Sequence, residues 1–194
     1  MANLHFRFGA MGSSKTASAL MLDYNFREKG MRTMLAKPAT DTRTDKMWSR
    51  IGLEADCITL DELCSKTYNE LAGFDCIIVD EAQFATDEQV EFLAGVADYL
   101  DIPVFLYGLK TDFQGRLFDG SKRIMELADE IEEIETTCWC GKAARFSARV
   151  NVDGNIIREG DVVKPEDGKN KPSYVALCRK HFFAGRCYSN KQQS

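Results

Sequence analysis

A glycine-rich stretch between a strand pattern and a helix pattern constrains this chain more than any other feature. Residues 6–20 read FRFGAMGSSKTASAL, in which Gly9, Lys15 and Thr16 have the spacing of the phosphate-binding pattern GxxxxGK[ST]. In such loops backbone amides approach phosphate oxygens, the lysine neutralises phosphate charge and the hydroxyl binds magnesium. Because Ser14 stands where the pattern has glycine, an ordinary strand-to-helix turn is an equal alternative on this stretch alone.

The serine at position 14 carries a conformational requirement. A side chain is tolerated there if the backbone φ is negative, or if strain of about 1 to 3 kcal/mol is compensated by the surrounding structure. Gly12, just upstream, can share the role of the missing glycine. A second signal has to decide whether the loop holds phosphate.

Strand and helix patterns alternate over the first 137 residues. Short apolar runs predict strands over 4–8, 32–36, 74–80 and 102–108. Apolar residues at helical spacing predict a helix over 16–29 and another that Thr86 and Gln89 open with a capping-box pattern. We therefore expect an α/β fold, a phosphate-loop-type parallel sheet flanked by helices, with ligands at the carboxyl ends of the strands.

The texture of the chain changes near residue 137. The remaining segment holds four of the seven cysteines and turn-rich stretches such as VDGN and EDGKN. We expect two domains: residues 1–137 as an α/β domain, and residues 138–194 as a small cysteine-rich domain.

Composition excludes several classes of partner. The net charge is −5 and no long Lys/Arg run is present, which argues against a nucleic acid polymer or an anionic membrane as the partner. The N-terminus lacks a signal-peptide pattern, and the longest apolar run, 102–109, is far shorter than the roughly 20 residues of a membrane-spanning helix. Cysteines in an unsecreted chain are reduced thiols or metal ligands, so we expect a cytoplasmic protein.

The second signal for a nucleotide site is the stretch CIIVDEAQF. It is an apolar strand pattern that ends in Asp80 and Glu81. A phosphotransferase needs one carboxylate for hydrated magnesium and another to orient or deprotonate the acceptor. The alternative is a solvated acidic pair at a strand end, but together with the upstream loop the stretch favours nucleotide chemistry.

The cysteine-rich segment contains two close pairs of metal-ligand residues. Cys138 and Cys140 form one pair, and Cys178 and His181 form the other. Two such pairs joined by a hairpin-sized insert supply four tetrahedral ligands, which leaves no open position for a catalytic water, so we expect a structural zinc ion. Cys187 is the reserve ligand. The remaining cysteines and the first histidine are expected to be core or edge residues: Cys57, Cys64, Cys76 and His5.

The ordered set of motifs resembles a known family. GAMGSSKT, DTR, DEAQF, YGLKTDFQGRLF, CWCGKAA and YVALCRKH occur in the order seen in the zinc-containing thymidine kinases of the bacterial and vertebrate cytosolic type. The resemblance runs from Leu4 to about Phe183. It implies that residues 1–137 form an ATP-binding domain, and that residues 138–194 form a zinc-binding domain with a loop that covers the nucleoside. It also implies ATP- and Mg²⁺-dependent phosphorylation of the 5′-hydroxyl of thymidine to dTMP, in nucleotide salvage.

The resemblance also implies roles for individual residues. Glu81 matches the family's general base, and Asp80 matches the residue that supports magnesium through water. Asp41 and Arg43 match a segment near the phosphates and metal, and Arg149 matches an arginine that faces the donor phosphates. The cofactor-binding set expected from the resemblance is Gly9, Ala10, Met11, Gly12, Ser13, Ser14, Lys15, Thr16, Asp41, Arg43, Asp80, Glu81, Ala82, Gln83 and Arg149.

A nucleoside pocket is implied in the same way. A planar base suits aromatic walls, although plain core packing is the alternative for each isolated aromatic residue. The loop expected to close over the base covers residues 162–174, and it lacks the GG often found in relatives. The residues that match the family's pocket are Met11, Phe84, Leu109, Phe113, Phe118 and Tyr174.

Two other functions fit parts of the pattern. LKTD, at 109–112, is similar to the guanine-reading motif of GTPase switches, but DEAQ stands where those proteins carry DxxG. A non-catalytic nucleotide-binding module is the other alternative, since Ser14 departs from the loop pattern.

The resemblance further implies a homotetramer that is inhibited by dTTP.

Overall fold

The computed structural model describes residues 2–39, 46–160 and 173–188. They fall into two compact units, each built from segments far apart in sequence. The first unit comprises Met1–Phe8, Ser14–Lys110 and Phe118–Glu133, and the second comprises Gly9–Ser13, Thr111–Leu117 and Ile134–Ser194. The expected domain boundary after residue 137 stays a prediction, although two short segments from before that boundary, Gly9–Ser13 and Thr111–Leu117, group with the C-terminal part of the chain.

The first unit is organised by a six-stranded sheet in which every pairing is parallel, in the order β5-β2-β6-β7-β1-β8. The predicted strands at its centre are therefore confirmed. The strands are β1 (Leu4–Phe8), β2 (Thr33–Lys37), β5 (Ile58–Thr59), β6 (Cys76–Val79), β7 (Val104–Gly108) and β8 (Glu130–Glu133).

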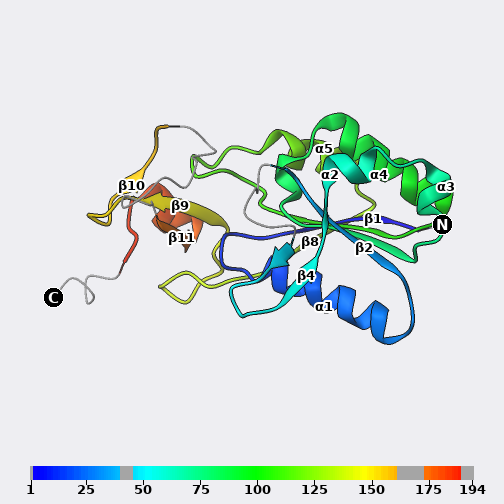
Figure 1. Cartoon of the computed structure of the whole chain (residues 1–194). Coiled ribbons are helices and arrows are strands. Elements are labelled where there is room, and N and C mark those ends of the chain that lie inside the picture. The colour runs from blue at the N-terminus through cyan, green and yellow to red at the C-terminus, as the bar shows by residue number, and fades with distance from the viewer. Residues whose placement is uncertain (1, 40–45, 161–172, 189–194) are drawn as a thin grey trace. The chain divides into compact units, whose positions relative to one another are not determined.

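Helices cover both faces of this sheet. Figure 1 shows α1 on one face and α2, α4 and α5 on the other. The helices are α1 (Lys15–Glu28), α2 (Leu60–Cys64), α3 (Tyr68–Leu71), α4 (Asp87–Leu100) and α5 (Asp119–Leu127), with the short 3-10 helix η1 (Ala82–Phe84) after β6. A two-stranded antiparallel hairpin, β3 (Lys46–Trp48) and β4 (Glu54–Asp56), completes the unit.

Burial follows the sequence patterns. All four residues of β6 and all five of β7 are buried, as expected for central strands covered on both faces. On α4 the apolar residues Val90, Leu93 and Ala97 are buried against the sheet core. The helix begins where predicted, because Thr86 accepts a hydrogen bond from the Gln89 amide and the Gln89 side chain accepts one from the Thr86 amide.

The second unit contains a three-stranded antiparallel sheet in the order β10-β9-β11. Its strands are β9 (Phe146–Val150), β10 (Ile156–Ile157) and β11 (Ser173–Leu177), and α6 (Arg179–Phe183) follows directly. Phe182 is fully buried and stacks on Phe146 with ring centroids 4.6 Å apart. This core is small, which is the circumstance in which a bound metal contributes most to folding.

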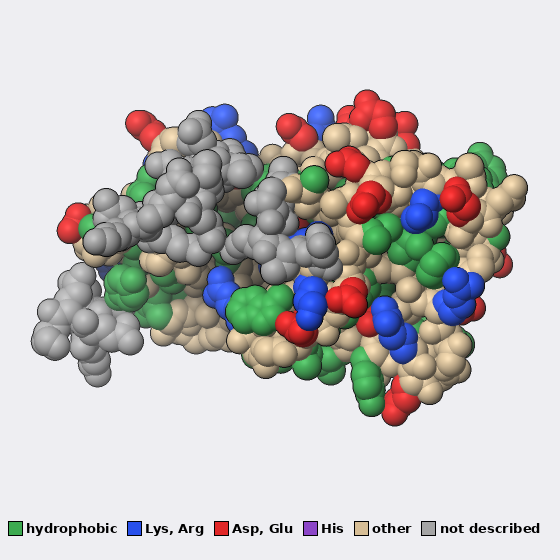
Figure 2. All heavy atoms as spheres, viewed as in Figure 1, with side chains coloured by type: hydrophobic (Ala, Val, Ile, Leu, Met, Phe, Trp, Pro, Cys, Tyr) green, Lys and Arg blue, Asp and Glu red, His purple; other side chains and the backbone are tan. Residues whose placement is uncertain are grey.

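On the face that Figure 2 shows, neither positively nor negatively charged side chains form a continuous patch. Figure 2 shows Lys and Arg side chains intermingled with Asp and Glu side chains over the described residues. Within the same residues, no helix combines the length and the apolar character that crossing a bilayer requires.

Candidate active site

The loop between β1 and α1 adopts a strained backbone at its substituted position. Ser14, the N-cap of α1, has φ 63° and ψ 28°, the left-handed conformation that glycine adopts most readily. Of the alternatives for this position, the structure therefore shows the strained one. The described residues include only two other non-glycine residues with positive φ, and one of them is Glu81. Strain of this kind concentrates at functional sites.

The start of the loop belongs to the second unit and is tightly packed there. A Cβ atom at Gly9 would lie 2.4 Å from Ser13 Oγ and 2.5 Å from the carbonyl oxygen of Ile134, so only glycine fits. The Met11 amide donates a hydrogen bond of 2.9 Å to Ser147 Oγ on β9. Ser147, which no sequence motif marks, thus anchors Met11 of the predicted phosphate loop.

Lys15, Thr16 and the acidic end of β6 meet within the first unit. Thr16 Oγ1 donates a hydrogen bond of 2.6 Å to Asp80 Oδ2. Burial lowers the pKa of Lys15, and the carboxylates of Glu81 and Asp80 partly oppose that shift. A buried lysine beside two carboxylates, at the N-terminus of a helix, is suited to bind a polyanion that is complexed with a cation.

The two oxygens of the Asp80 carboxylate have different surroundings. Asp80 is 4% exposed, and its Oδ1 is buried without a hydrogen-bond partner among the described residues. Burial, and next the neighbouring Glu81 carboxylate, raise the pKa of Asp80 to about 7. A buried carboxylate oxygen of this kind is satisfied by a hydrated divalent cation, so Asp80 and Thr16 fit the role of magnesium support.

Glu81 is held by a neighbour two residues along the chain. Gln83 Nε2 donates to Glu81 Oε2 at 2.5 Å, and Gln83 Oε1 accepts from the Leu109 amide at 2.9 Å. Gln83 is 2% exposed, so its amide is fixed at both ends within the protein. The left-handed backbone at Glu81 and this side-chain contact together define where its carboxylate lies.

The residues expected around the nucleoside form two groups. In the first unit, Phe84 and Phe118 pack edge to face with ring centroids 5.5 Å apart, and Leu109 lies at the end of β7. In the second unit, Arg149 joins Phe113 and Tyr174. Its guanidinium carbon lies 3.7 Å from the Phe113 ring centroid, and its Nε donates to the Tyr174 hydroxyl at 3.0 Å.

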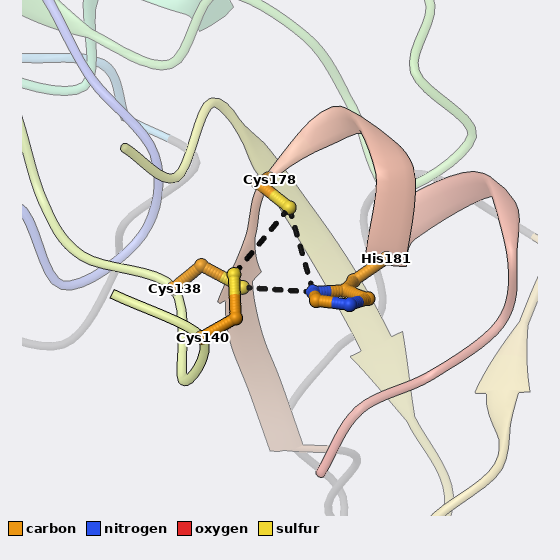
Figure 3. A group of neighbouring side chains, drawn as sticks. All are labelled: Cys138, Cys140, Cys178 and His181. Carbon is orange, nitrogen blue, oxygen red and sulfur yellow. Dashed lines mark hydrogen bonds between the residues drawn. The ribbon is translucent and has the colours of Figure 1, made fainter. Parts of the chain in front are cut away.

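Four metal-ligand side chains converge in the second unit, as Figure 3 shows. The ligand atoms of Cys138, Cys140, Cys178 and His181 all lie within 4.8 Å of one another. His181 Nδ1 is 3.5 Å from the Cys138 sulfur and 3.4 Å from the Cys178 sulfur, and the sulfurs of Cys140 and Cys178 are 3.9 Å apart. Zinc–sulfur bonds of about 2.3 Å in a tetrahedron place sulfurs about 3.8 Å apart, so the cluster fits zinc.

The environment of the cluster matches a closed site. The Trp139 ring stacks on His181 with centroids 4.1 Å apart and so covers the imidazole. Burial raises the pKa of the Cys138 thiol, whereas a backbone hydrogen bond from Lys142 lowers the pKa of Cys140. Metal binding requires thiolates, so the metal affinity depends on pH. Its free energy contributes to folding because the unfolded chain lacks the assembled site. Cys187, the reserve ligand, is buried but is not in the cluster.

Three sequence expectations lie outside the described residues or remain predictions. Asp41 and Arg43 fall in residues 40–45, and most of the loop at 162–174 falls in residues 161–172, which the structure does not describe. The contact of Arg149 with donor phosphates also stays a prediction. The contacts given above join it to the Phe113 ring and to the Tyr174 hydroxyl.

Two positions have stronger structural roles than the sequence suggested. Gln83 was expected only as part of the cofactor-binding stretch, and Ser147 was not expected at all. Nothing in the local pattern marks Ser147, because its partner, the Met11 amide, is 136 residues away. Gln83 offered one signal: a glutamine so close after an acidic pair is within reach of the carboxylates.

The chain is similar over nearly its whole length to known proteins. The family model described as thymidine kinase matches residues 2–182. The chain is 43% identical to a thymidine kinase of Rhodopirellula baltica, over 94% of this chain and 88% of that protein. It is 41% identical to thymidine kinases of Coxiella burnetii, over 96% and 97%, and of Enterobacteria phage T4, over 94% and 96%.

Matches of this extent cover the loop, the acidic strand end and the metal cluster together. Both the family model and the relatives span nearly the whole chain, so the resemblance is not limited to one motif. On this basis the chain belongs to the thymidine kinase family.

Proposed function

We propose that this protein transfers the γ-phosphoryl group of ATP to the 5′-hydroxyl of thymidine, giving dTMP and ADP in a magnesium-dependent reaction. The observation that carries the proposal is the arrangement at the end of β6. There Thr16 and Asp80 share a hydrogen bond, Asp80 has a buried oxygen without a partner in the described part of the chain, and Glu81 follows directly. Family membership supports the choice of nucleoside, since the relatives are named for thymidine.

The chemistry assigns a separate task to each residue. Lys15 neutralises phosphate charge, and Thr16 with Asp80 holds hydrated magnesium, which supplies electrostatic stabilisation of the phosphates when bound. Glu81 accepts the proton of the 5′-hydroxyl while the new O–P bond forms and the bond to the β,γ-bridging oxygen breaks. A positioned base of this kind contributes about a hundred- to ten-thousand-fold in rate.

Nucleoside binding falls to the apolar and aromatic residues implied by the resemblance. A thymine ring has two π-faces, and aromatic side chains bind such faces with defined geometry. We propose that Phe84, Leu109 and Phe118 of the first unit contribute to this binding, and that Met11, Phe113 and Tyr174 of the second unit do so too.

The Cys/His cluster is proposed to hold one structural zinc ion per chain. Its four ligands complete a tetrahedron, which leaves zinc without an open position for chemistry. The small core of the second unit supports this role, because such a unit gains folding free energy from the metal. A homotetramer and inhibition by dTTP are proposed on the family resemblance alone. A cytoplasmic location is proposed because the cysteines are interpreted as reduced thiols or metal ligands.

A panel assay tests the function directly. Purified protein is incubated with Mg²⁺, either ATP or GTP, and thymidine, deoxyuridine, deoxycytidine or no nucleoside. The proposal predicts ATP-dependent formation of dTMP. Hydrolysis of GTP without nucleoside would instead indicate a switch, and tight nucleotide binding without any product would indicate a non-catalytic module.

A further inference from the structure

We propose that Arg149 is a positioning residue that holds the Phe113 and Tyr174 rings in place for nucleoside binding, an inference that rests on the proposed function. The family resemblance alone would place this arginine at the donor phosphates. Its contacts in the second unit suggest a different task. Arg149 is 1% exposed, and it ranks among the largest fully buried side chains of the described residues.

The Arg149 guanidinium lies over the face of the Phe113 ring. The guanidinium carbon lies 3.7 Å from the ring centroid, which is van der Waals contact between two planar groups. A guanidinium stacks on an aromatic face through its plane as well as its charge, whereas the ammonium of lysine is a compact point charge. This contact therefore fixes the plane of the Phe113 ring in a way that only arginine reproduces in full.

Strand pairing brings Tyr174 to the same guanidinium. Arg149 on β9 and Tyr174 on β11 are direct partners in the antiparallel register, so their side chains lie on one face of the sheet. Arg149 Nε donates to the Tyr174 hydroxyl at 3.0 Å. A single buried cation thus links two aromatic rings from segments that are about sixty residues apart in sequence.

The backbone that carries Phe113 is held independently of Arg149. Asp112 Oδ1 accepts from the amides of Gln114 and Arg116, at 2.8 and 2.9 Å, and closes the turn. Gln114 Nε2 donates to the Arg158 carbonyl oxygen at 2.9 Å and ties this turn to the segment after β10. Loss of the Arg149 guanidinium should therefore release the ring orientations while leaving the turn itself formed.

A positioning role and a phosphate contact predict opposite kinetic signatures. A residue that orders the nucleoside walls affects the KM of thymidine, whereas a residue bound to the donor phosphates affects the KM of ATP. The full-length protein carrying Arg149→Met keeps the volume and loses both the charge and the plane. Arg149→Lys keeps the charge alone, and Tyr174→Phe removes only the hydroxyl that Arg149 contacts.

The positioning role predicts that Arg149→Met raises the KM of thymidine about tenfold or more while the KM of ATP stays within about twofold. Arg149→Lys should recover part of the loss, and Tyr174→Phe should show a smaller rise in the same parameter. The exposed Arg145, just before β9, provides a control: Arg145→Met should leave both KM values unchanged. Thermal melting and zinc content report whether each variant is folded, and Arg149→Lys with Tyr174→Phe carry the test if Arg149→Met does not fold.

The outcomes separate the two levels of the proposal. A rise in the KM of ATP with thymidine unaffected would overturn the positioning role in favour of a phosphate contact. An unchanged thymidine KM in a folded Arg149→Met protein would overturn it as well, while the function stands as long as the wild-type protein makes dTMP. A wild-type protein that does not phosphorylate thymidine would contradict the proposed function itself.

Discussion

Gln83 Nε2 lies 2.5 Å from Glu81 Oε2, and the other end of the same amide accepts a hydrogen bond from the Leu109 backbone. The buried Gln83 side chain thereby links the Leu109 amide, directly after β7, to Glu81, the proposed general base. The close approach also constrains Gly108, because a Cβ atom there would lie 2.8 Å from Gln83 Oε1. The Glu81 carboxylate is therefore oriented by the Gln83 amide, which the Leu109 backbone holds in turn.

Replacing this amide should slow the chemical step rather than weaken binding. Gln83→Met keeps the volume but removes both hydrogen bonds, so the Glu81 carboxylate loses its fixed orientation. We expect kcat to fall about ten- to a hundredfold, with the KM of thymidine and of ATP within about threefold of the wild-type values. Steady-state kinetics at saturating Mg²⁺ measure this split; equal losses in kcat and in nucleotide affinity would point to general misfolding instead.

The Asp80 carboxylate should lower the stability of the folded protein although activity requires it. Its pKa is raised in the folded protein, so the folded state loses stability as the pH rises from about 4 through about 7, where the unfolded state has already released its proton. Asp80→Asn removes that buried charge and keeps an oxygen that accepts from Thr16. We expect it to raise the free energy of unfolding at pH 8 by about 1 to 3 kcal/mol in magnesium-free buffer, and to abolish activity.

Urea unfolding of the wild-type protein and of Asp80→Asn at pH 5 and pH 8 measures this effect. The difference between the two proteins should be larger at pH 8, because the carboxylate is ionised there. A difference that is independent of pH would mean that the Asp80 charge is not destabilising in the folded state.

The strained turn at Ser14 predicts a stabilising substitution. Ser14→Gly removes the Cβ penalty of the left-handed backbone, which is about 1 to 2 kcal/mol, although the greater flexibility of glycine in the unfolded chain cancels part of the gain. We expect a net gain of up to about 1 kcal/mol and a KM of ATP that is unchanged or lower. Ser14→Ala is the matched control: it keeps the Cβ, so thermal melts should show no gain.

Zinc removal should unfold the second unit and abolish activity. Metal analysis of the purified protein should give one zinc ion per chain, and Cys140→Ser should lose it together with the cooperative thermal transition of this unit. Structural zinc contributes on the order of 10 kcal/mol, far more than a single thiol contributes by packing. Cys57→Ser, outside the cluster, should retain both zinc and activity. A zinc-free protein with full activity would exclude the structural role.

Elements with a strong local pattern could be predicted from the sequence. The central strands are continuous apolar runs, and the capping-box residues Thr86 and Gln89 mark the start of α4. The convergence of Cys138, Cys140, Cys178 and His181 was predictable because their spacing in two close pairs is the spacing that a tetrahedral metal site requires. Three further features depend on partners distant in sequence and could not be predicted locally.

The first is β8, whose residues Glu130–Glu133 are mostly acidic and exposed. It forms a strand because its backbone pairs with β1, and Glu130 and Glu132 meet His5 and Arg7 at 3.1 Å each. The second is the grouping of Gly9–Ser13 and Thr111–Leu117 with the C-terminal segment. The third is the complete burial of Arg149, since a charged residue in a strand pattern normally indicates the exposed face.

Glu81→Gln in a single-turnover reaction tests the central claim most directly. The protein, in excess over ATP labelled in the γ-phosphate, is mixed with thymidine and Mg²⁺, and label in dTMP is followed with time, while binding of a non-hydrolysable ATP analogue is measured in parallel. The account predicts rapid labelling by the wild-type protein, a rate at least about a hundredfold lower for Glu81→Gln, and near-equal affinity for the analogue. A Glu81→Gln protein that labels dTMP within a few-fold of the wild-type rate would contradict the assignment of Glu81 as the base.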